Sequence, residues 1–189
     1  MENELSDLDS RINEVLRNGS HIEPVDSFLF DTCKSVCKII TSTQIGSGFL
    51  IKLFKGNSPF NCLITCEHVI TDDIIKSEEI DIFYNNQRNK FSIDLKKEKR
   101  FIQYYTIIEV DAISVEILPK DNIPDYFFLL SNLDYKFDFI NLKNTEICIL
   151  QFPEGGDLSY SYGKIISISN YEFKHTASTN KALREVLFF

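Results

Sequence analysis

Short apolar segments rich in β-branched residues follow one another along most of the chain. Between residues 112 and 118, Ile113, Val115 and Ile117 alternate with small or polar residues, which is the period of a half-buried strand. Such segments recur at short intervals with no helical pattern between them, so we expect an all-β barrel or sandwich with antiparallel strands. We predict ten strands: Ser35–Thr41, Gly48–Phe54, Cys62–Thr65, Ile80–Tyr84, Phe91–Leu95, Ile102–Glu109, Ala112–Leu118, Glu146–Phe152, Tyr160–Ser169 and Glu172–Ser178.

Two stretches depart from the strand pattern. Residues 4–17 carry five aliphatic side chains at helical spacing and end at Asn18-Gly19, which predicts a short amphipathic helix. Residues 119–145 are rich in Asp, Asn, Tyr and Phe, which predicts an irregular connector that contains a domain boundary. The expected organisation is therefore an N-terminal helical extension, a first β-domain, a connector and a second β-domain, at residues 1–27, 28–119, 120–145 and 146–189.

Composition narrows the class of protein. Of the 189 residues, 43% are hydrophobic and 25% are charged, as in a folded globular protein. The formal net charge of −8, from 20 basic and 28 acidic residues, argues against a nucleic-acid partner, because phosphate binding needs a basic surface. No apolar run approaches the roughly 18 residues of a membrane span, so we expect no membrane association. The acidic segment 1–11 resembles neither a secretory signal nor an Arg-rich transit peptide, and we expect a cytoplasmic protein.

The five cysteines are expected to be reduced thiols, and the two pairs described next are expected to be buried. Cys33 and Cys37 are four residues apart, as are Cys62 and Cys66, which at first suggests zinc. Both pairs lie in apolar, β-like segments, whereas structural zinc sites more often have two-residue spacers flanked by turn residues. An odd number of cysteines in a protein expected in the cytoplasm also favours thiols over disulfides, and we predict no metal site.

Three features place candidate catalytic residues next to strands. His68 follows an apolar strand, Asp111 directly precedes the alternating strand at 112–118, and Gly46 and Gly48 stand where another strand opens. Each feature alone has an ordinary explanation: a structural histidine, a turn aspartate and a glycine turn. Of the other two histidines, His21 lies in the N-terminal connector and we assign it no role.

Taken in order, these features resemble the first barrel of a trypsin-like serine peptidase, most closely the cytosolic type without a signal peptide. In that family a glycine-rich strand precedes a strand that closes on the catalytic histidine, and the catalytic aspartate opens a later strand. The 43 residues between His68 and Asp111 suit this order. The matching segments are Gly46-Ser47-Gly48-Phe49-Leu50-Ile51, Leu63-Ile64-Thr65-Cys66-Glu67-His68-Val69 and Asp111-Ala112-Ile113-Ser114-Val115-Glu116-Ile117.

Three later segments resemble the second barrel of the same family: Ile147–Gly156, Ser161–Ile165 and His175–Thr179. The likeness spans about residues 35–181 and implies two β-barrels with the catalytic triad between them. In the family, the segment matched by His175 lines the specificity pocket, so His175 and Thr176 are expected to contact the substrate.

The resemblance implies peptide-bond hydrolysis by a serine whose hydroxyl is activated by a neighbouring base. His68 would take the hydroxyl proton and return it to the leaving amine, while Asp111 would fix the imidazole tautomer and stabilise the imidazolium. We therefore expect the His68 imidazole within about 3.5 Å of the Asp111 carboxylate. The implied substrate is a peptide or protein, and this chemistry needs no cofactor.

The family's nucleophile segment has no match here. Where the family continues with Gly-Ser-x-Gly-Ser-Pro, this sequence continues with Ala-Leu-Arg-Glu-Val-Leu-Phe-Phe from Ala182. Ser161 and Ser178 lie in predicted strands without a glycine turn to expose them, so neither is a nucleophile candidate. Possible codons for residues 182–189, read one base earlier, permit Gly-Ser-x-Gly-Ser-Pro followed by apolar residues. We therefore expect a single-base frameshift after codon 181.

The expected architecture is a chymotrypsin-like double β-barrel with a complete first barrel, an incomplete second barrel and a short N-terminal α-helix. Its expected function is that of a trypsin-like serine endopeptidase domain, inactive in this chain for want of the nucleophile. The alternative is a non-catalytic, protease-like module that binds a peptide or protein, and a third hypothesis is an unrelated β-rich protein. Because an incomplete barrel leaves strand edges open, we expect residues 146–189 to be poorly ordered or prone to aggregation.

Overall fold

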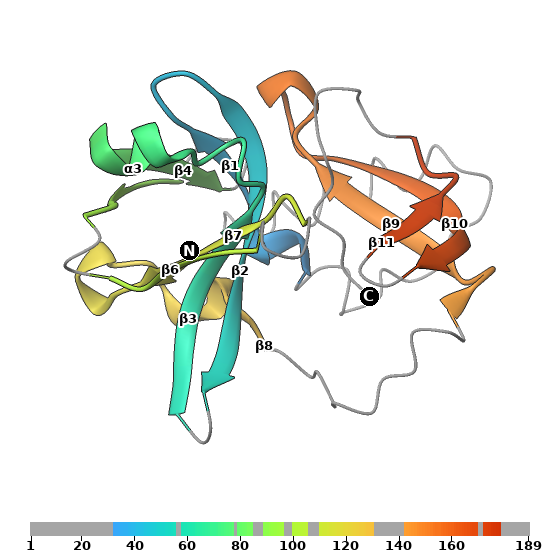
Figure 1. Cartoon of the computed structure of the whole chain (residues 1–189), viewed down its shortest axis with the longest axis horizontal. Helices are drawn as coiled ribbons and strands as arrows, with labels where there is room; N and C mark the ends of the chain where they lie inside the picture. Colours follow the sequence, from blue (N-terminus) through green and yellow to red (C-terminus); the bar gives the residue numbers. More distant parts are fainter. Residues whose placement is uncertain are drawn as a thin grey trace, which may run out of the picture.

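The structure is a computed structural model, which describes residues 32–55, 58–77, 79–84, 89–96, 100–105, 110–130, 142–169 and 172–178. The predicted helix at 4–17, His21 and the tail after residue 178 lie outside the described residues, as do residues 106–109 of one predicted strand. In chain order the elements are β1 (Val36–Ile40), β2 (Ile45–Lys55), β3 (Ser58–Thr65), α3 (Asp72–Ser77), β4 (Glu79–Tyr84), β5 (Asn89–Asp94), β6 (Ile102–Tyr104), β7 (Ile113–Ile117), η3 (Pro119–Asp121), η4 (Asp125–Phe127), β8 (Leu129–Leu130), β9 (Glu146–Gln151), η6 (Pro153–Gly155), β10 (Ser159–Ser169) and β11 (Glu172–His175) (Figure 1).

Strands β1 to β8 form one curled sheet. Its strand order is β5-β4-β1-β2-β3-β7-β6, and β8 lies beside β2. Neighbouring strands are antiparallel, except that β8 runs parallel to β2. The all-β prediction is confirmed, and each of the ten predicted strands overlaps an observed one.

The core of this first sheet consists of the alternating apolar positions of its strands. Ile39 of β1 and both Ile113 and Val115 of β7 are fully buried in one cluster. Phe127 of η4 joins the same cluster and stacks on Tyr84 of β4, with the ring centroids 4.6 Å apart. The first part of the predicted connector therefore packs into the core of the first sheet.

The second sheet contains β9, β10 and β11, with β10 in the middle and both pairs antiparallel. Its smaller core includes Ile149 and Ile165, which are buried, and Ala177 packs against them. A side chain at position 163 would put its Cβ 2.1 Å from the backbone nitrogen of Ala177, so the close approach of this segment to β10 requires Gly163.

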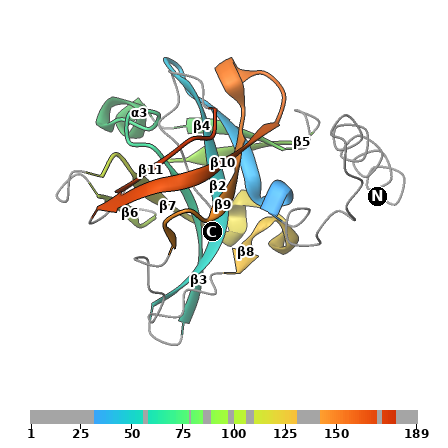
Figure 2. The ribbon, with the colours of Figure 1, turned by 90° about the vertical axis from the view of Figure 1, so that its right-hand side faces the viewer.

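The two sheets lie side by side in Figure 1, and the second sheet lies in front of the first in Figure 2. Two hydrogen bonds connect them. The buried Ser47 hydroxyl of β2 accepts from the backbone N–H of Phe152 at 3.0 Å, and the Lys38 ammonium of β1 donates to the Gly155 carbonyl, also at 3.0 Å. Each bond fixes an element of one sheet against a turn that follows β9.

Helix α3 and strand β8 were not predicted, and neither were the short 3-10 elements η3, η4 and η6. Helix α3 has only six residues, with Asp72 and Asp73 in its first turn and Lys76 in its last, which suits the helix dipole. Six residues are too few to show a helical period. Strand β8 has only two residues and is defined by its pairing with β2, which is distant in sequence. No helix in the described part of the chain is long and apolar enough to cross a bilayer.

Candidate active site

The register between β3 and β7 brings His68 and Asp111 together. Thr65, the last residue of β3, pairs with Ile113, the first residue of β7. Because the strands are antiparallel, the residues that leave β3 then run beside the residues that enter β7. The turn after β3 is closed by a hydrogen bond from the Val69 N–H to the Cys66 carbonyl at 3.1 Å, and His68 lies within this turn.

Two hydrogen bonds hold the pair. His68 Nδ1 lies 2.7 Å from Asp111 Oδ2, and the backbone N–H of His68 donates to Asp111 Oδ1 at 3.2 Å. The distance expected from the sequence is thus confirmed. A carboxylate that binds both the ring and the main chain of one residue fixes where that ring points.

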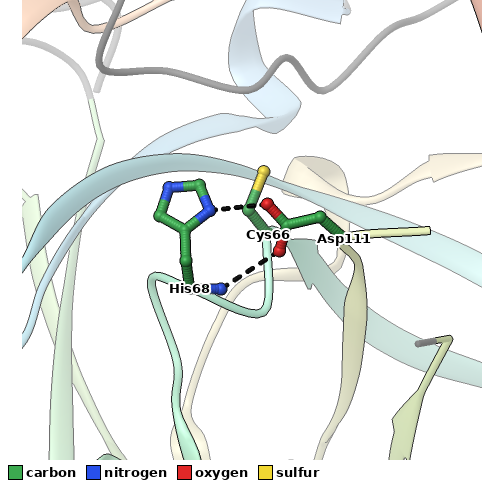
Figure 3. A group of neighbouring side chains, drawn as sticks. All are labelled: Cys66, His68 and Asp111. Atoms are coloured by element: carbon green, nitrogen blue, oxygen red, sulfur yellow. Dashed lines mark hydrogen bonds and ion pairs between the residues drawn. The ribbon is translucent and has the colours of Figure 1, made fainter. Parts of the chain in front are cut away.

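This arrangement decides which ring nitrogen of His68 is available for proton transfer. With Asp111 accepting from Nδ1, neutral His68 carries its proton on Nδ1 and a lone pair on Nε2. Figure 3 shows Nε2 pointing away from Asp111 and Cys66. The side chain of His68 is 40% exposed and that of Asp111 is 19% exposed, so the imidazole is the more accessible member of the pair. A base oriented in this way can take a proton from a group that approaches Nε2.

Gly46 allows β2 to approach the turn that carries His68 closely. A Cβ at position 46 would lie 2.5 Å from a methyl group of Val69, the residue after His68. The Thr65 hydroxyl donates to the carbonyl of Ser47 at 2.7 Å, between the two glycines. Gly46 therefore lets β2 pack directly against the histidine turn, whereas a Cβ at Gly48 would meet Ile39 of β1 and Leu63 and Ile64 of β3.

Cys66 is the one member of this group that we did not predict as a site residue. Donor atoms of Cys66, His68 and Asp111 all lie within 4.8 Å of one another (Figure 3). Cys66 is buried, as predicted, and only 5% exposed. No strand period relates Cys66 to His68, because β3 ends at Thr65 and His68 lies in the turn that follows.

The structure places His175 and Thr176 at the end of β11 in the second sheet, apart from the group around His68. The Thr176 hydroxyl accepts from the backbone N–H of Lys164 at 2.9 Å, which ties this segment to β10. The His175 ring lies 6.1 Å from the Phe173 ring. The assignment of these two residues to the substrate remains a prediction.

The two serines that were excluded as nucleophile candidates, Ser161 and Ser178, lie in or directly after strands of the second sheet. Ser161 is within β10, opposite Ile149 of β9, and its hydroxyl oxygen is buried. Ser178 follows β11, and its carbonyl accepts from the Gln151 amide at 3.3 Å.

The other cysteines lie in environments that keep them protonated. None of the five, all of which the structure describes, forms a disulfide. Burial raises the pKa of Cys33 to about 11 and the pKa values of Cys37 and Cys62 to about 12. Cys37 and Cys62 are buried as predicted, whereas Cys33, which was also predicted to be buried, is half-buried because it lies before β1, at the edge of a small core; Cys148 is half-buried too. These four behave as packing residues.

Comparison with known proteins connects this geometry to a fold. No model of a protein family matches the sequence. No curated protein matches it either. Solved structures do match. The Rv3671c protease of M. tuberculosis H37Rv, as a mutant in an inactive form, is 16% identical with a TM-score of 0.53, over 86% of this chain and 73% of that one.

Two further structures are similar to the chain. Deg5 is 12% identical with a TM-score of 0.56, over 84% of this chain and 75% of that one. A serine endoprotease from Yersinia pestis is 16% identical with a TM-score of 0.50, over 78% of this chain and 47% of that one. At these identities the likeness concerns the fold. This chain therefore has the chymotrypsin-like fold of trypsin-like serine proteases, as its sequence predicted.

Proposed function

We propose that the chain is a trypsin-like serine endopeptidase domain that acts on peptides or proteins, with His68 as the general base and Asp111 as the residue that orients it. The observation that carries the proposal is the 2.7 Å contact between His68 Nδ1 and Asp111 Oδ2, in a fold shared with serine proteases. An aspartate bonded to Nδ1, with Nε2 pointing away from it, is the arrangement that serine hydrolysis requires of its base.

In the proposed reaction, Nε2 of His68 removes the proton of a serine hydroxyl as the oxygen attacks the peptide carbonyl. The imidazolium that forms is stabilised by the carboxylate of Asp111, which remains ionised. His68 then returns the proton to the leaving amine. The acyl-enzyme is hydrolysed by a water molecule that His68 activates in the same way. His175 and Thr176, on the second sheet, are proposed to contact the substrate residue before the scissile bond.

The serine itself is the part of this mechanism that the printed sequence does not supply. After Asp111 no serine stands in a Gly-x-Ser-Gly or Gly-x-Ser-Pro setting. We therefore propose that the 189-residue polypeptide, by itself, hydrolyses no peptide bond. The nucleophile is proposed to lie in the alternative reading frame that begins after codon 181, where the codons of the tail permit Gly-Ser-x-Gly-Ser-Pro.

Sequencing the transcript across codon 181 and about two hundred bases beyond it tests the proposal. The expected result is that one base restores Gly-Ser-x-Gly-Ser-Pro, followed by further strand-forming segments. If the transcript instead encodes residues 182–189 in the printed frame, with no Gly-Ser-x-Gly-Ser-Pro beyond them, the endopeptidase proposal fails for this gene product.

That second outcome would favour a different function, a protease-like module that binds a peptide or protein without cleaving it. The absence of a suitably placed serine from the printed sequence is the observation in its favour. Retention of both His68 and Asp111 in hydrogen-bonded geometry weighs against it, since peptide binding needs neither residue. We therefore place the endopeptidase first.

A further inference from the structure

We propose that Cys66, His68 and Asp111 form a binding site for Zn²⁺. One donor atom of each side chain lies within 4.8 Å of the donor atoms of the other two (Figure 3). The site differs from the cysteine pairs considered in the sequence, because it uses Cys66 without Cys62. In the described part of the chain, no other three His, Cys, Asp or Glu side chains come together in this way.

The donor set suits zinc. Zn²⁺ prefers thiolate sulfur, imidazole nitrogen and carboxylate oxygen, commonly with four ligands in tetrahedral geometry. Three protein ligands leave one position for a water molecule. A thiolate and a carboxylate together balance the two positive charges of the ion, which favours Zn²⁺ over a monovalent cation.

The required ligand movements are small. Bond lengths of about 2.0–2.3 Å place tetrahedral ligands about 3.3–3.6 Å apart. The distance between His68 Nδ1 and Asp111 Oδ2, now 2.7 Å, would therefore widen by about 0.6–0.9 Å as the ion replaces the proton between them. Cys66 directly follows β3 and Asp111 lies two residues before β7. The ligands Cys66 and Asp111 are therefore held by two strands that pair with each other.

The ion has an accessible side from which to enter. Cys66 is only 5% exposed, but the side chains of His68 and Asp111 are 40% and 19% exposed. Zn²⁺ would approach past the imidazole and reach the sulfur last. On binding, the thiol releases its proton to solvent as the sulfur–metal bond forms, the imidazole gives up its Nδ1 proton and takes one from solvent at Nε2, and water leaves the ion as each ligand replaces it.

Binding at Nδ1 would switch off the base. With the metal on Nδ1, neutral imidazole carries its proton on Nε2, so the lone pair that faces a serine hydroxyl is lost. Zn²⁺ would thus be a reversible inhibitor of the domain. This consequence rests on the proposed function, whereas the binding itself does not.

Titration of the 189-residue chain with Co²⁺, which takes the same ligands and absorbs light, tests the site. We expect one equivalent of Co²⁺ to produce a thiolate-to-cobalt charge-transfer band in the near ultraviolet, together with visible bands of tetrahedral cobalt. One equivalent of Zn²⁺ should remove both. Cys66→Ser should abolish the charge-transfer band, and His68→Gln should weaken Zn²⁺ affinity at least about tenfold.

Cys33→Ser and Cys148→Ser are the matched controls, because these thiols are the half-buried ones and should leave the band unchanged. Near-ultraviolet circular dichroism reports whether each variant folds, and the substitution at the 40% exposed His68 tests the site if Cys66→Ser does not fold. No band at saturating Co²⁺, an unchanged Zn²⁺ affinity in folded His68→Gln, or a band that survives Cys66→Ser would overturn the proposal. No readout of this experiment involves hydrolysis. If Co²⁺ binds but the transcript encodes no nucleophile, the metal site is supported and the endopeptidase proposal fails.

Discussion

At the scale of single residues, the position of one proton decides what His68 can do. The carboxylate of Asp111 accepts from Nδ1 and from the His68 backbone, which leaves Nε2 as the basic atom. An exposed histidine without such a partner usually populates both tautomers, and only one of them presents Nε2 as a base.

Nitrogen-15 NMR of the imidazole tests this assignment. In the neutral state we expect Nδ1 of His68 to be protonated and Nε2 to be unprotonated. Asp111→Ala should remove that preference and produce a mixture of tautomers, because nothing then accepts from Nδ1. His68→Gln identifies the signals. A His68 whose proton resides mainly on Nε2 in the unsubstituted chain would contradict the geometry.

At the scale of elements, the sequence predicted where the strands lie but not which strands pair with each other. Alternation at Ile113, Val115 and Ile117 is a local signal, and it located β7 to within a residue at each end. The pairing of Thr65 with Ile113 is not local and was not predicted; only the proximity of His68 and Asp111 was expected, through the resemblance to a protease family. The neighbourhood of Cys66 depends on this register, which explains why the cysteine was predicted only as a buried thiol.

An ion pair between two connecting segments is expected to carry much of the local stability. Arg100, beside β6, forms a two-pronged ion pair with Asp121 of η3, with both N–O distances 3.0 Å, and the two side chains are 0% and 4% exposed. Asp121→Asn should lower the free energy of unfolding by about 3–5 kcal/mol, because a buried guanidinium then lacks its counter-charge. Urea denaturation measures the change.

The matched control is Glu146→Gln, which breaks the Lys164–Glu146 pair, whose side chains are 60% and 81% exposed. We expect it to change the free energy of unfolding by no more than about 1 kcal/mol, since solvent screens an exposed pair. Equal effects of the two substitutions would show that burial does not set the strength of these ion pairs.

The hydrogen bond from the Phe152 N–H to the Ser47 hydroxyl, which connects the two sheets, leads to a second prediction at this scale. Ser47→Ala removes the acceptor for the buried Phe152 N–H and should cost about 1–3 kcal/mol in urea denaturation. Ser92→Ala is the control, because the Ser92 hydroxyl donates to Asp81 at an exposed position. A loss at Ser47 no larger than the loss at Ser92 would mean that this bond does not stabilise the junction.

At the scale of the whole molecule, buried thiols make stability depend on pH. Burial raises the pKa of Cys37 to about 12, whereas an unfolded thiol titrates near about 8.5. The folded state therefore keeps a proton that the unfolded state loses, and the stabilisation present below about pH 8.5 declines as pH rises toward 12. We expect a decline of up to about 1.4 kcal/mol per pH unit for this group.

Unfolding free energies measured between pH 8 and 10.5 test the decline. Cys37→Ala should show a shallower dependence on pH, by about one proton, because the titrating group is gone. Burial also raises the pKa of Tyr84, so some dependence should remain in the variant. A stability that is constant over this range would contradict the burial of protonated thiols in the core.

Reaction of the gene product with a serine-directed fluorophosphonate probe tests the proposed endopeptidase most directly. The product that continues past codon 181 in the frame containing Gly-Ser-x-Gly-Ser-Pro should be labelled at that serine, and the 189-residue chain should not be labelled. His68→Ala should abolish labelling of the longer product, and Asp111→Asn should slow its peptide hydrolysis by about 10⁴-fold. A longer product that stays unlabelled, or one that is labelled equally well without His68, would contradict the assignment of His68 and Asp111 as its catalytic pair.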